Sequence, residues 1–528
     1  MDMRRRLYGV ALGLVATLAG LAAGGLVAGL FRSAAEPVLP VGQVVIDHVT
    51  PGIKDWAIDT FGTADKAVLI AGTVFVLAVI GSLVGLLMAS GRRAAACLVT
   101  AGVGLVGVLA VFERPEPSLV KLLPALAGTV VSLAVLVWPG HDWAADTNTG
   151  TDTADADPAI DPDGRRQLLV RLSSVGVLAL AGGALGRLLR NRFDVDAERA
   201  ELELPPVEPA PAASVPTSSL PTVVSPAGLP GEVPGPTEFG LAGITPFVVP
   251  SADFYRIDTA LAVPQVPRAD WRLRIHGMVD QELELTFDDV LARPQVERQV
   301  TLSCVSNWVG GPLVGNAVWQ GVLLAPLLAE CGVHPDATQV VSRSVDGWTA
   351  GSPTSVITDG RDALLAIGMN GEPLPAAHGY PARLVVPGLY GYVSATKWVT
   401  EIELVRWEDF DAYWVPRGWA KEAPVKTMAR IDRAVDGYLA GVAWAVHRGV
   451  SRVEVRIDEG EWMECELAGV PSDDTWRQWR LPLDPALPNG FRAQARAYDG
   501  GGQVQPPGPK AEAPDGAEGY HTRTMERA

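Results

Sequence analysis

The sequence is short of cysteine and of the motifs that hold metals. Four cysteines stand among its 528 residues, which is too few for a scaffold stapled by disulfides. The chain contains no C-x-x-C pair and no H-x-x-x-H pair, so a zinc site has no support. A C-x-x-C-H motif for covalent haem attachment is absent as well.

Basic residues are also in the minority. Lys and Arg number 43 against 60 for Asp and Glu, which gives a formal net charge of −17. Nucleic-acid binding needs a basic face that neutralises phosphates, so this balance argues against it. Much of the acid lies in two segments, 141–164 and 194–211, which we interpret as solvated.

Long apolar runs fill the N-terminal part of the chain. A membrane-spanning helix needs about 20 mostly apolar residues. Four runs come near that length, at about 7–31, 67–88, 94–112 and 120–138. A fifth run, at about 168–189, is weaker because Arg171 lies near its start. These runs predict five membrane spans.

The predicted spans are poor in ionisable side chains. None of the seven histidines lies inside a span, whereas a bundle that holds b-type haem normally needs histidines facing each other inside it. The lack of acids and bases within the first four spans also argues against an ion transporter. We therefore interpret these four spans as an anchor in membrane lipid or a docking surface for a partner.

Arginine clusters near the ends of the spans indicate their orientation. Arginines 4–6 precede the first span, 92–93 separate the second from the third, and 165–166 precede the fifth. If the spans alternate in direction, all three clusters lie on one side, which is then the cytoplasmic side. The acidic segment 139–166 would be a cytoplasmic loop, and everything after about residue 190 would lie outside the cytoplasm.

The fifth segment resembles a twin-arginine export signal in an internal position. In "GRRQLLVRLSS" (164–174), adjacent arginines precede Leu168, Leu169, Arg171 and a moderately apolar run. Such a signal implies export of an already folded domain. The alternative is ordinary basic flanking of a span. No A-x-A cleavage site directly follows the run, so we expect the segment to remain as an anchor.

The remainder of the chain changes pattern twice. Residues 191–245 are rich in proline and predict an extended linker. From 246 to 412, strand and helix patterns alternate and predict a mixed α+β domain. Its expected strands include 271–279 and 298–307, its expected helices are 286–294 and 318–332, and 382–405 is expected to be strand, glycine loop and strand.

The last part of the chain, 413–528, contains short strand patterns separated by turn signals. This spacing predicts a small β-sandwich. Its expected role is structural packing or the formation of a homodimer.

Cys304 is the cysteine with the most suggestive surroundings. It lies in "TLSCVSNWVGG" (301–311), between an apolar run and a glycine-rich turn. A metal-binding cysteine must be a thiolate, and such a turn offers backbone N–H groups and close approach for a large cofactor. On this chemistry alone, the stronger interpretation is a small buried hydrophobic residue.

The motifs around Cys304 reverse that preference. "TLSCVSNWVGG", the following "WQGVLLAPLL" and "MNGEPLPAAHGYPARLVVPGLYGYVSATKW" (369–398) together resemble the sulfite oxidase family of molybdenum enzymes over about 250–410. The strands that follow resemble the immunoglobulin-like domain of that family. The resemblance implies a pyranopterin molybdenum cofactor, with Cys304 as the protein's sulfur ligand to molybdenum. A cofactor inserted in the cytoplasm would also agree with export in the folded state.

The resemblance further implies which residues contact the cofactor. They stand in "DFYRIDTAL" (253–261), directly after the cysteine, in the "HGxPxR" motif and in the glycine loop before Trp398, and are Arg256, Asn307, His378, Arg383, Ser394, Thr396 and Lys397. Tyr390 and Tyr392 flank Gly391 and could face the metal as catalytic groups. Packing beside Trp398 is the alternative for both tyrosines.

The residues after Asn307 depart from the family's pattern. Sulfite oxidases typically place basic residues there, whereas this chain has Trp308, Val309 and two glycines. The loss of an anion-binding element makes the site more apolar. Besides sulfite, a neutral small molecule such as a sulfoxide therefore becomes a candidate substrate.

The resulting prediction is a multi-domain, multi-pass protein of the plasma membrane. It comprises a four-helix transmembrane region (1–138), the acidic loop (139–166), the fifth transmembrane segment (167–190), the linker (191–245), a molybdopterin-binding oxidoreductase domain (246–412) and an immunoglobulin-like domain (413–528). The extracytoplasmic domain would move one oxygen atom between substrate and water, exchanging two electrons. Because the sequence contains no haem module, we expect a separate electron-transfer partner, either a haem protein or one linked to quinone.

Two other functions fit parts of the sequence. The missing basic residues after Asn307 would suit a catalytically degenerate scaffold or binding module that keeps the fold. A transporter with an exported sensor domain is the other alternative, and the shortage of polar residues in the spans weakens it.

Overall fold

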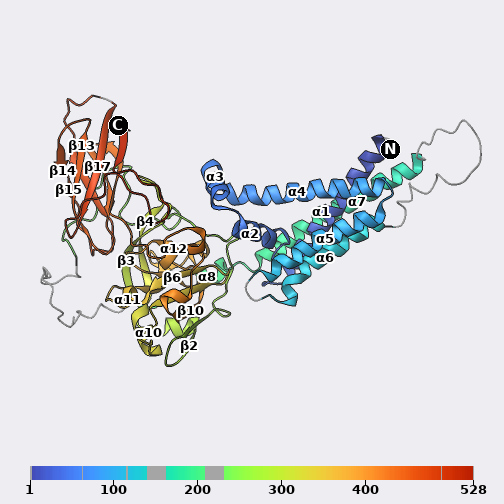
Figure 1. Cartoon of the computed structure of the whole chain (residues 1–528), viewed down its shortest axis with the longest axis horizontal. Helices are drawn as coiled ribbons and strands as arrows, with labels where there is room; N and C mark the ends of the chain where they lie inside the picture. Colours follow the sequence, from blue (N-terminus) through green and yellow to red (C-terminus); the bar gives the residue numbers. More distant parts are fainter. Residues whose placement is uncertain are drawn as a thin grey trace, which may run out of the picture. The chain divides into compact units, whose positions relative to one another are not determined.

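The chain forms two compact units (Figure 1). The computed structural model describes residues 3–61, 64–114, 117–138, 162–207, 231–488 and 490–526. The first unit comprises Met1–Asp194 with Thr259–Val263, and the second comprises Val195–Asp258 with Pro264–Ala528. Most of the predicted acidic loop and the centre of the predicted linker lie outside the described residues.

The first unit is helical. Its helices are α1 (Met3–Leu30), α2 (Val38–His48), α3 (Pro51–Phe61), α4 (Asp65–Ala89), α5 (Arg93–Phe112), α6 (Leu119–Val137) and α7 (Pro162–Asn191). Within the described residues, five helical segments are long and apolar enough to cross a membrane: Arg5–Leu30, Asp65–Ala89, Arg93–Phe112, Leu119–Val137 and Val170–Glu201. They coincide with the five predicted runs and suit a membrane protein.

Helix α1 is the centre of this bundle, because it packs against α4, α6 and α7. Glycines bring the backbones together. A Cβ atom added to Gly13 would lie 1.8 Å from Gly81 O of α4, and one added to Gly29 would lie 2.4 Å from Gly186 O of α7. Small residues that permit such close approach are typical of helix packing in membranes. Larger side chains at these positions would push α1 away from its neighbours.

The second unit contains two five-stranded sheets in its α+β part. The first has the order β2 (Leu283–Thr286), β1 (Arg272–Gly277), β10 (Val399–Val405), β5 (Gln339–Ser344) and β6 (Thr349–Pro353). In it β1 and β10 are parallel and the other pairs antiparallel. The second runs β3 (Val296–Ser303), β4 (Val314–Leu323), β7 (Leu364–Met369) and β8 (Glu372–Pro373), with β9 (Arg383–Val385) also paired to β7.

Short helices precede, connect and follow these strands. They are α8 (Asp196–Glu201), α9 (Phe287–Leu291), α10 (Leu324–Cys331), α11 (Thr354–Ile357) and α12 (Gly391–Ser394), with 3₁₀ turns η2 (Ala376–His378), η3 (Trp407–Asp409) and η4 (Val415–Arg417). Thr286 caps α9 in a reciprocal box with Asp289, as its sequence predicts. The mixed α+β architecture of this part is therefore as predicted.

One predicted helix, 318–332, is wrong over its first half. Residues up to Leu323 belong to β4, which pairs with β3 and β7 on its two sides, and only Leu324–Cys331 is helical. Strand β4 is buried along almost its whole length. A strand covered on both faces reads as a continuous apolar run, and periodicity cannot separate such a run from a buried helix.

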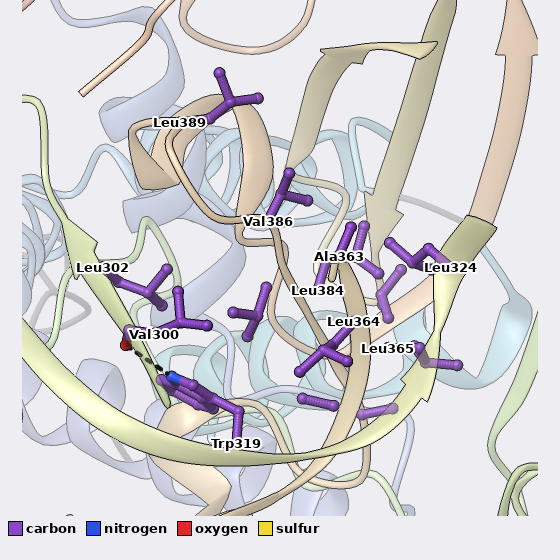
Figure 2. Close-up of a cluster of buried hydrophobic side chains, with 14 of the residues drawn as sticks. Val300, Leu302, Trp319, Leu324, Ala363, Leu364, Leu365, Leu384, Val386 and Leu389 are labelled. Carbon is purple, nitrogen blue, oxygen red and sulfur yellow. Dashed lines mark hydrogen bonds between the residues drawn. The ribbon is translucent and has the colours of Figure 1, made fainter. Parts of the chain in front are cut away.

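The hydrophobic core of the α+β part surrounds the second sheet (Figure 2). Trp319 of β4 is fully buried, and its indole N–H donates to Val300 O of β3 at 3.2 Å. Around it Figure 2 labels side chains from β3, α10, β7, β9 and the residues near β7 and β9: Leu302, Leu324, Ala363, Leu364, Leu365, Leu384, Val386 and Leu389. Each fully buried side chain of this size stabilises the fold by about 1.5–3 kcal/mol.

The C-terminal part is mostly β, as predicted. One four-stranded sheet has the order β11 (Met428–Val435), β12 (Tyr438–Trp444), β16 (Arg477–Pro482) and β15 (Glu466–Leu467). The other has the order β14 (Trp462–Glu464), β13 (Val450–Ile457), β17 (Phe491–Asp499) and β18 (His521–Met525). Both sheets contribute to one hydrophobic cluster, the first through Ile431 and Leu439 and the second through Val455 and Phe491.

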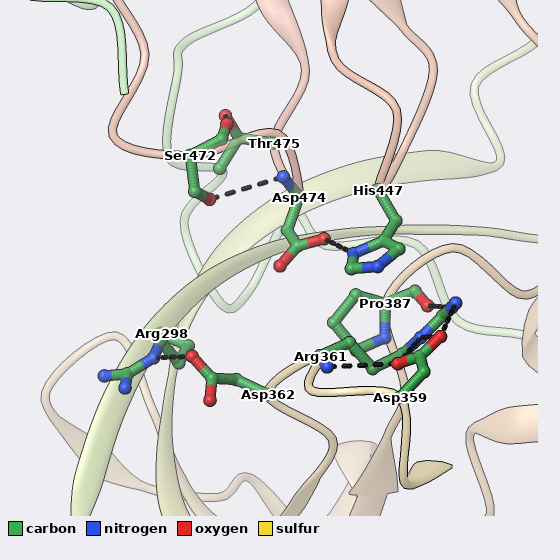
Figure 3. A network of polar contacts seen from close by, with 9 residues as sticks. All are labelled: Arg298, Asp359, Arg361, Asp362, Pro387, His447, Ser472, Asp474 and Thr475. Atoms are coloured by element: carbon green, nitrogen blue, oxygen red, sulfur yellow. Dashed lines mark hydrogen bonds and ion pairs between the residues drawn. The ribbon is translucent and has the colours of Figure 1, made fainter. Parts of the chain in front are cut away.

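The two parts of the second unit meet at a polar network (Figure 3). His447 Nδ1 lies 2.8 Å from Asp474 Oδ1, and Arg361 donates to Pro387 O at 2.6 Å. Arg361 also pairs with Asp359. Each of these contacts lies within one of the two parts. The parts are joined by Thr301, whose N–H donates to Asp474 O at 2.9 Å and whose Oγ1 accepts from Trp476 N at 2.7 Å.

Both ends of the predicted linker make contacts within the described residues. Helix α7 continues to Asn191 and α8 follows it. Pro205 O accepts a hydrogen bond from Gln320 Nε2 at 2.7 Å, and Val233 forms a β-bridge with Val470. Proline lacks an N–H group but keeps its carbonyl acceptor, so a proline-rich stretch can still pack against a domain.

We expect Gly13→Leu to disrupt the bundle, because the new side chain must displace the backbone of α4. Overpacking of this kind costs about 1–3 kcal/mol. The melting temperature of the detergent-solubilised protein should fall measurably. Gly102→Leu is the matched control, because a Cβ atom there meets nothing within 4 Å. Equal melting temperatures for the two variants would contradict the packing role of Gly13.

Candidate functional site

Cys304 begins a loop that closes on itself. Its N–H donates to Leu313 O at 2.9 Å, directly after the end of β3 and before the start of β4. Asn307 holds the loop from inside: its N–H donates to Cys304 O at 3.1 Å, and its Oδ1 accepts from Leu313 N at 2.9 Å. The position of the cysteine is therefore set by the loop 304–313.

The thiol of Cys304 is free and half-buried. Burial raises its pKa, while hydrogen bonds from Ser306 N–H and hydroxyl and from Val305 N–H act in the opposite direction. Burial disfavours the charged thiolate, and a bound cation favours it. The N–H and hydroxyl donors around the sulfur would stabilise a thiolate, and a bound metal ion would supply the remaining stabilisation of its charge.

Asn307 also offers a free donor. Its side chain is buried, and its Nδ2 atom has no hydrogen-bond partner among the described residues. A buried polar group left without a partner is costly, and native proteins rarely tolerate one. The amide therefore has the properties expected of a ligand contact.

Two tyrosines lie in the electrostatic field of Cys304. Burial raises the pKa of Tyr255 and of Tyr390, and the negative charge of a Cys304 thiolate would raise both further. The hydroxyl of Tyr390 accepts a long hydrogen bond of 3.4 Å from Lys426 N. Both phenols are therefore protonated donors at neutral pH.

Tyr392 has a different environment from Tyr390. Its hydroxyl donates to Ala420 O at 2.5 Å, and its ring packs 5.9 Å from the ring of Trp419. Burial raises its pKa, and the further charges that act on it are Asp515 and Tyr390. Among the charges that act on the two tyrosines, that of Cys304 acts on Tyr390, whereas the Tyr392 hydroxyl is bonded to the backbone.

The "HGYPAR" turn carries two further predicted residues. His378 ends the 3₁₀ turn η2, and Arg383 begins β9. Between them Gly379 has a φ of +115°, and a Cβ atom there would lie 3.0 Å from Arg383 Cβ. Glycine is required at this position because other residues avoid such a conformation. The turn presents both side chains to the same buried region.

Arg383 is buried without a carboxylate partner. Only 5% of it is exposed. Within the described residues its hydrogen bonds go to the backbone carbonyls of His378, Leu384 and Ala395, and its guanidinium lies 4.8 Å from the centre of the Trp319 ring. Burial lowers its pKa to about 10. A buried cation normally has an anionic partner, so the structure suits an anionic ligand here.

Lys397 and Arg256 meet at one carboxylate. Lys397 Nζ lies 2.7 Å from Asp258 Oδ2, and Arg256 Nε lies 2.8 Å from the same oxygen. Burial lowers the pKa of Lys397 to about 8, against the effect of Asp258. The charges of Arg383 and Arg256 also lower the pKa of Lys397, so the three cations act on one another.

His378 is neutral within this cluster. Its Nε2 donates to Ser251 O at 3.0 Å. Burial, followed by the charges of Arg383 and Lys397, lowers its pKa to about 4. The imidazole is therefore a neutral group whose Nδ1 is the acceptor.

Ser394 and Thr396 use their hydroxyl groups inside the protein. Ser394 Oγ donates to Tyr390 O at 2.9 Å, and Thr396 Oγ1 lies 2.6 Å from Ser342 Oγ. Both residues are buried. The structure supports a role in shaping the loop between α12 and β10.

Three residues of the site escaped the sequence analysis: Tyr255, Asp258 and Ser251. All lie in the segment that carries Arg256, and Tyr255 and Asp258 stand within two positions of it. Proximity to Arg256 was the signal that could have found them. Apart from the pair of Asp258 with Arg256, their contacts depend on residues more than 40 positions away, which the local sequence does not reveal.

The donor set fits an anionic cofactor that carries a metal. Cys304 supplies a sulfur ligand, and soft thiolates suit metals held by other sulfur donors. Arg383, Lys397 and Arg256 supply positive charge for an anionic group, and Asn307 supplies a buried donor. Within the described residues, no group of three or more His, Cys, Asp or Glu could hold a metal ion by itself.

Comparison with known proteins points to the same chemistry. A family model described as "Oxidoreductase molybdopterin binding domain" matches residues 260–414. "Uncharacterized oxidoreductase YuiH" of Bacillus subtilis is 36% identical over 149 residues, which cover 28% of this chain and 72% of that protein. Of the residues implied by the motifs, all but Arg256 lie in the matched range.

More distant relatives match a longer part of the chain. The mitochondrial sulfite oxidase of Drosophila melanogaster is 28% identical over 322 residues, covering 49% of this chain and 55% of that protein. Nitrate reductase [NADH] 1 of Oryza sativa subsp. japonica is 29% identical, covering 49% and 36%. The chain thus spans little more than half of the length of the sulfite oxidase. Sulfane dehydrogenase SoxCD from Paracoccus pantotrophus aligns in structure with a TM-score of 0.46 and 23% identity, covering 59% of this chain and 96% of that chain.

We expect Arg383→Met to separate stability from cofactor binding. The variant removes a buried charge that lacks a carboxylate, so the metal-free protein should be as stable as the parent or more stable. Molybdenum per chain should fall by about tenfold or more, because a hydrogen bond to a charged group is worth about 1.5–3 kcal/mol. Elemental analysis and thermal unfolding measure the two effects. Arg274→Met, which removes an exposed ion pair with Glu282, should change neither, and an unaltered metal content in Arg383→Met would refute the assignment.

Proposed function

The chain belongs to the sulfite oxidase family of molybdopterin-dependent oxidoreductases, and we propose that it is a membrane-anchored member that transfers one oxygen atom to or from a small molecule. It is a molybdenum oxidoreductase that uses the molybdenum cofactor. When bound, this cofactor supplies the two-electron oxygen-atom chemistry. The observation that carries the proposal is the half-buried free thiol of Cys304 in the same α+β part as the buried cations Arg383 and Lys397.

The proposed roles follow from the contacts of each residue. Cys304 is the thiolate ligand to molybdenum, and Asn307 sets its position and donates through Nδ2 to the bound cofactor. Arg383 and Lys397 hold the anionic end of the cofactor, which supplies the negative charge that their burial requires. His378 remains neutral and binds without adding charge.

Arg256 belongs to the same cluster of cations as Lys397, and its side chain is more exposed than that of Lys397. Its side chain pairs with Asp258, which also binds Lys397. We propose that Arg256 acts on the cofactor site indirectly, by keeping Asp258 in place. Ser394 and Thr396 shape the adjoining loop through their own hydrogen bonds.

Tyr390 is the proposed catalytic donor beside the metal. Burial raises its pKa, so its hydroxyl stays protonated and can orient the oxygen of a substrate. Tyr255 is a second candidate, since it shares the field of Cys304 and Arg383. Tyr392 drops out of this role because its hydroxyl is bonded to Ala420 O.

A neutral substrate suits the loop after Asn307. Trp308 is 52% exposed, and Val309 packs against the core. Neither side chain can bind a dianion in the way that arginine does. We propose a sulfoxide or a similar neutral oxygen-atom donor or acceptor, with sulfite as the alternative.

The location and partners are also proposals. The apolar helices support a plasma-membrane protein, and the basic clusters favour an extracytoplasmic catalytic domain. Electrons would be exchanged with a separate haem protein or quinone-linked partner. The two C-terminal sheets are proposed to form the family's immunoglobulin-like domain and to mediate a homodimer.

We expect Cys304→Ala to abolish turnover while the protein still folds, because the thiol is half-buried and the loop is held by backbone and Asn307 bonds. Turnover should fall by about a thousandfold or more, the scale seen when an essential group is removed. Cys331→Ala is the control, since Cys331 is packed in α10. Both variants are compared by steady-state rates and molybdenum content, and full activity of Cys304→Ala would eliminate the ligand assignment.

A substrate screen tests the reaction. Purified protein is supplied with an artificial electron donor or acceptor, and sulfite oxidation is compared with sulfoxide reduction. The apolar loop predicts a higher kcat/KM for the sulfoxide. Efficient sulfite oxidation would instead favour the alternative substrate. A protein free of molybdenum after expression in a cofactor-competent host would support a degenerate scaffold. The lack of basic residues after Asn307 is the reason for considering this alternative.

A further inference from the structure

We infer that the C-terminal β part positions the cysteine loop 304–313 through Arg430 and His521. This goes beyond a packing or dimerisation role for that part of the chain. It rests on the proposed function only in treating Cys304 as the metal ligand. Arg430 and His521 touch neither Cys304 nor the cofactor contacts directly, so they are positioning residues.

Arg430 reaches the loop from strand β11. Its Nη1 donates to Gly311 O at 3.1 Å. The other two nitrogens are occupied as well, since Nη2 donates to Thr245 Oγ1 at 2.5 Å and Nε to Asp432 Oδ1 at 2.8 Å. A planar guanidinium that donates a hydrogen bond from each of its three nitrogens is held in a fixed orientation. The carbonyl of Gly311 is thereby tied to the C-terminal sheet.

His521 confines the loop from strand β18. Its Nδ1 accepts from Ile431 N at 2.8 Å, which fixes the plane of the ring. A Cβ atom added to Gly310 would lie 2.2 Å from Nε2 of this ring, and Gly310 has a φ of +82°. The imidazole therefore occupies the space that any side chain at position 310 would need.

The loop transmits this constraint to the cysteine. Gly311 N donates to Trp308 O at 2.8 Å, and Trp308 directly follows Asn307. Asn307 in turn bonds both Cys304 O and Leu313 N. A shift of the 310–311 segment would therefore alter the turn at Asn307 and move the sulfur atom.

The strand before the cysteine is held by the same part of the chain. Thr301 N donates to Asp474 O at 2.9 Å, and Trp476 N donates to Thr301 Oγ1 at 2.7 Å. Cys304 is thus bracketed on both sides by contacts with the C-terminal part. The contacts before the cysteine are made at the end of β3, and the contacts after it are made at Gly310 and Gly311.

This arrangement gives the two glycines after Trp308 a structural reason. Position 310 needs glycine because of His521, and a Cβ atom at Gly311 would lie 2.5 Å from Asn307 Oδ1. A long basic side chain at either position would collide with the groups that hold the loop. The departure from the basic pattern of sulfite oxidases is therefore coupled to the way in which this loop is held.

The first test compares Arg430→Met, Arg430→Lys and the control Arg480→Met. Arg480 lies on the same sheet but pairs with Glu466. In full-length protein prepared without molybdenum, the alkylation rate of Cys304 by iodoacetamide is followed by mass spectrometry. We expect Arg430→Met to raise the rate at least fivefold, Arg430→Lys to restore part of the protection, and Arg480→Met to leave it unchanged. A rate for Arg430→Met within twofold of the parent would overturn the inference.

The second test uses the contact between Gly310 and His521. Gly310→Ala should raise the alkylation rate of Cys304 and broaden or shift the molybdenum(V) electron paramagnetic resonance signal of the loaded enzyme. Adding His521→Ala should reverse part of both changes, because it removes the collision. Additive effects of the two substitutions would contradict the inference. The alkylation rate needs no molybdenum, so a failure of the proposed function would appear in the metal content and leave this test readable.

Discussion

A buried guanidinium that has no carboxylate partner among the described residues is the constraint on which the candidate site depends. Arg383 is held by carbonyl oxygens and by the face of Trp319. Carbonyl dipoles reduce the cost of burying its charge, but they do not neutralise it. An anionic cofactor does, and a ligand that binds only the folded state stabilises that state. On the proposed role of Arg383, folding of the α+β part and loading of the cofactor would be linked through one residue.

Local sequence patterns predicted those elements whose burial and capping depend on residues within the element itself. Strand β1 alternates buried and exposed residues, and α9 carries its own cap at Thr286. The strand β4 and the two ends of the linker were missed because their partners are distant. The sequence around residue 320 contains no sign that strands will cover both of its edges.

The site divides in the same way. Motif spacing predicts Cys304, Asn307, His378, Arg383 and Lys397 as site residues. In the structure Asn307 N donates to Cys304 O, and Arg383 donates to His378 O. The sequence gives no means of telling the roles of Tyr390 and Tyr392 apart. Tyr390 is the N-cap residue of α12, and Tyr392 lies within this helix. Asp258 was missed because a carboxylate in a loop has no distinguishing pattern until Lys397 and Arg256 converge on it.

The central place of α1 has a consequence for biogenesis. This helix stands first among the helices of the bundle, yet its Gly29 fits against Gly186 of α7, which begins only at Pro162. A chain interrupted between α6 and α7 would therefore lack the partner of α1 at Gly29.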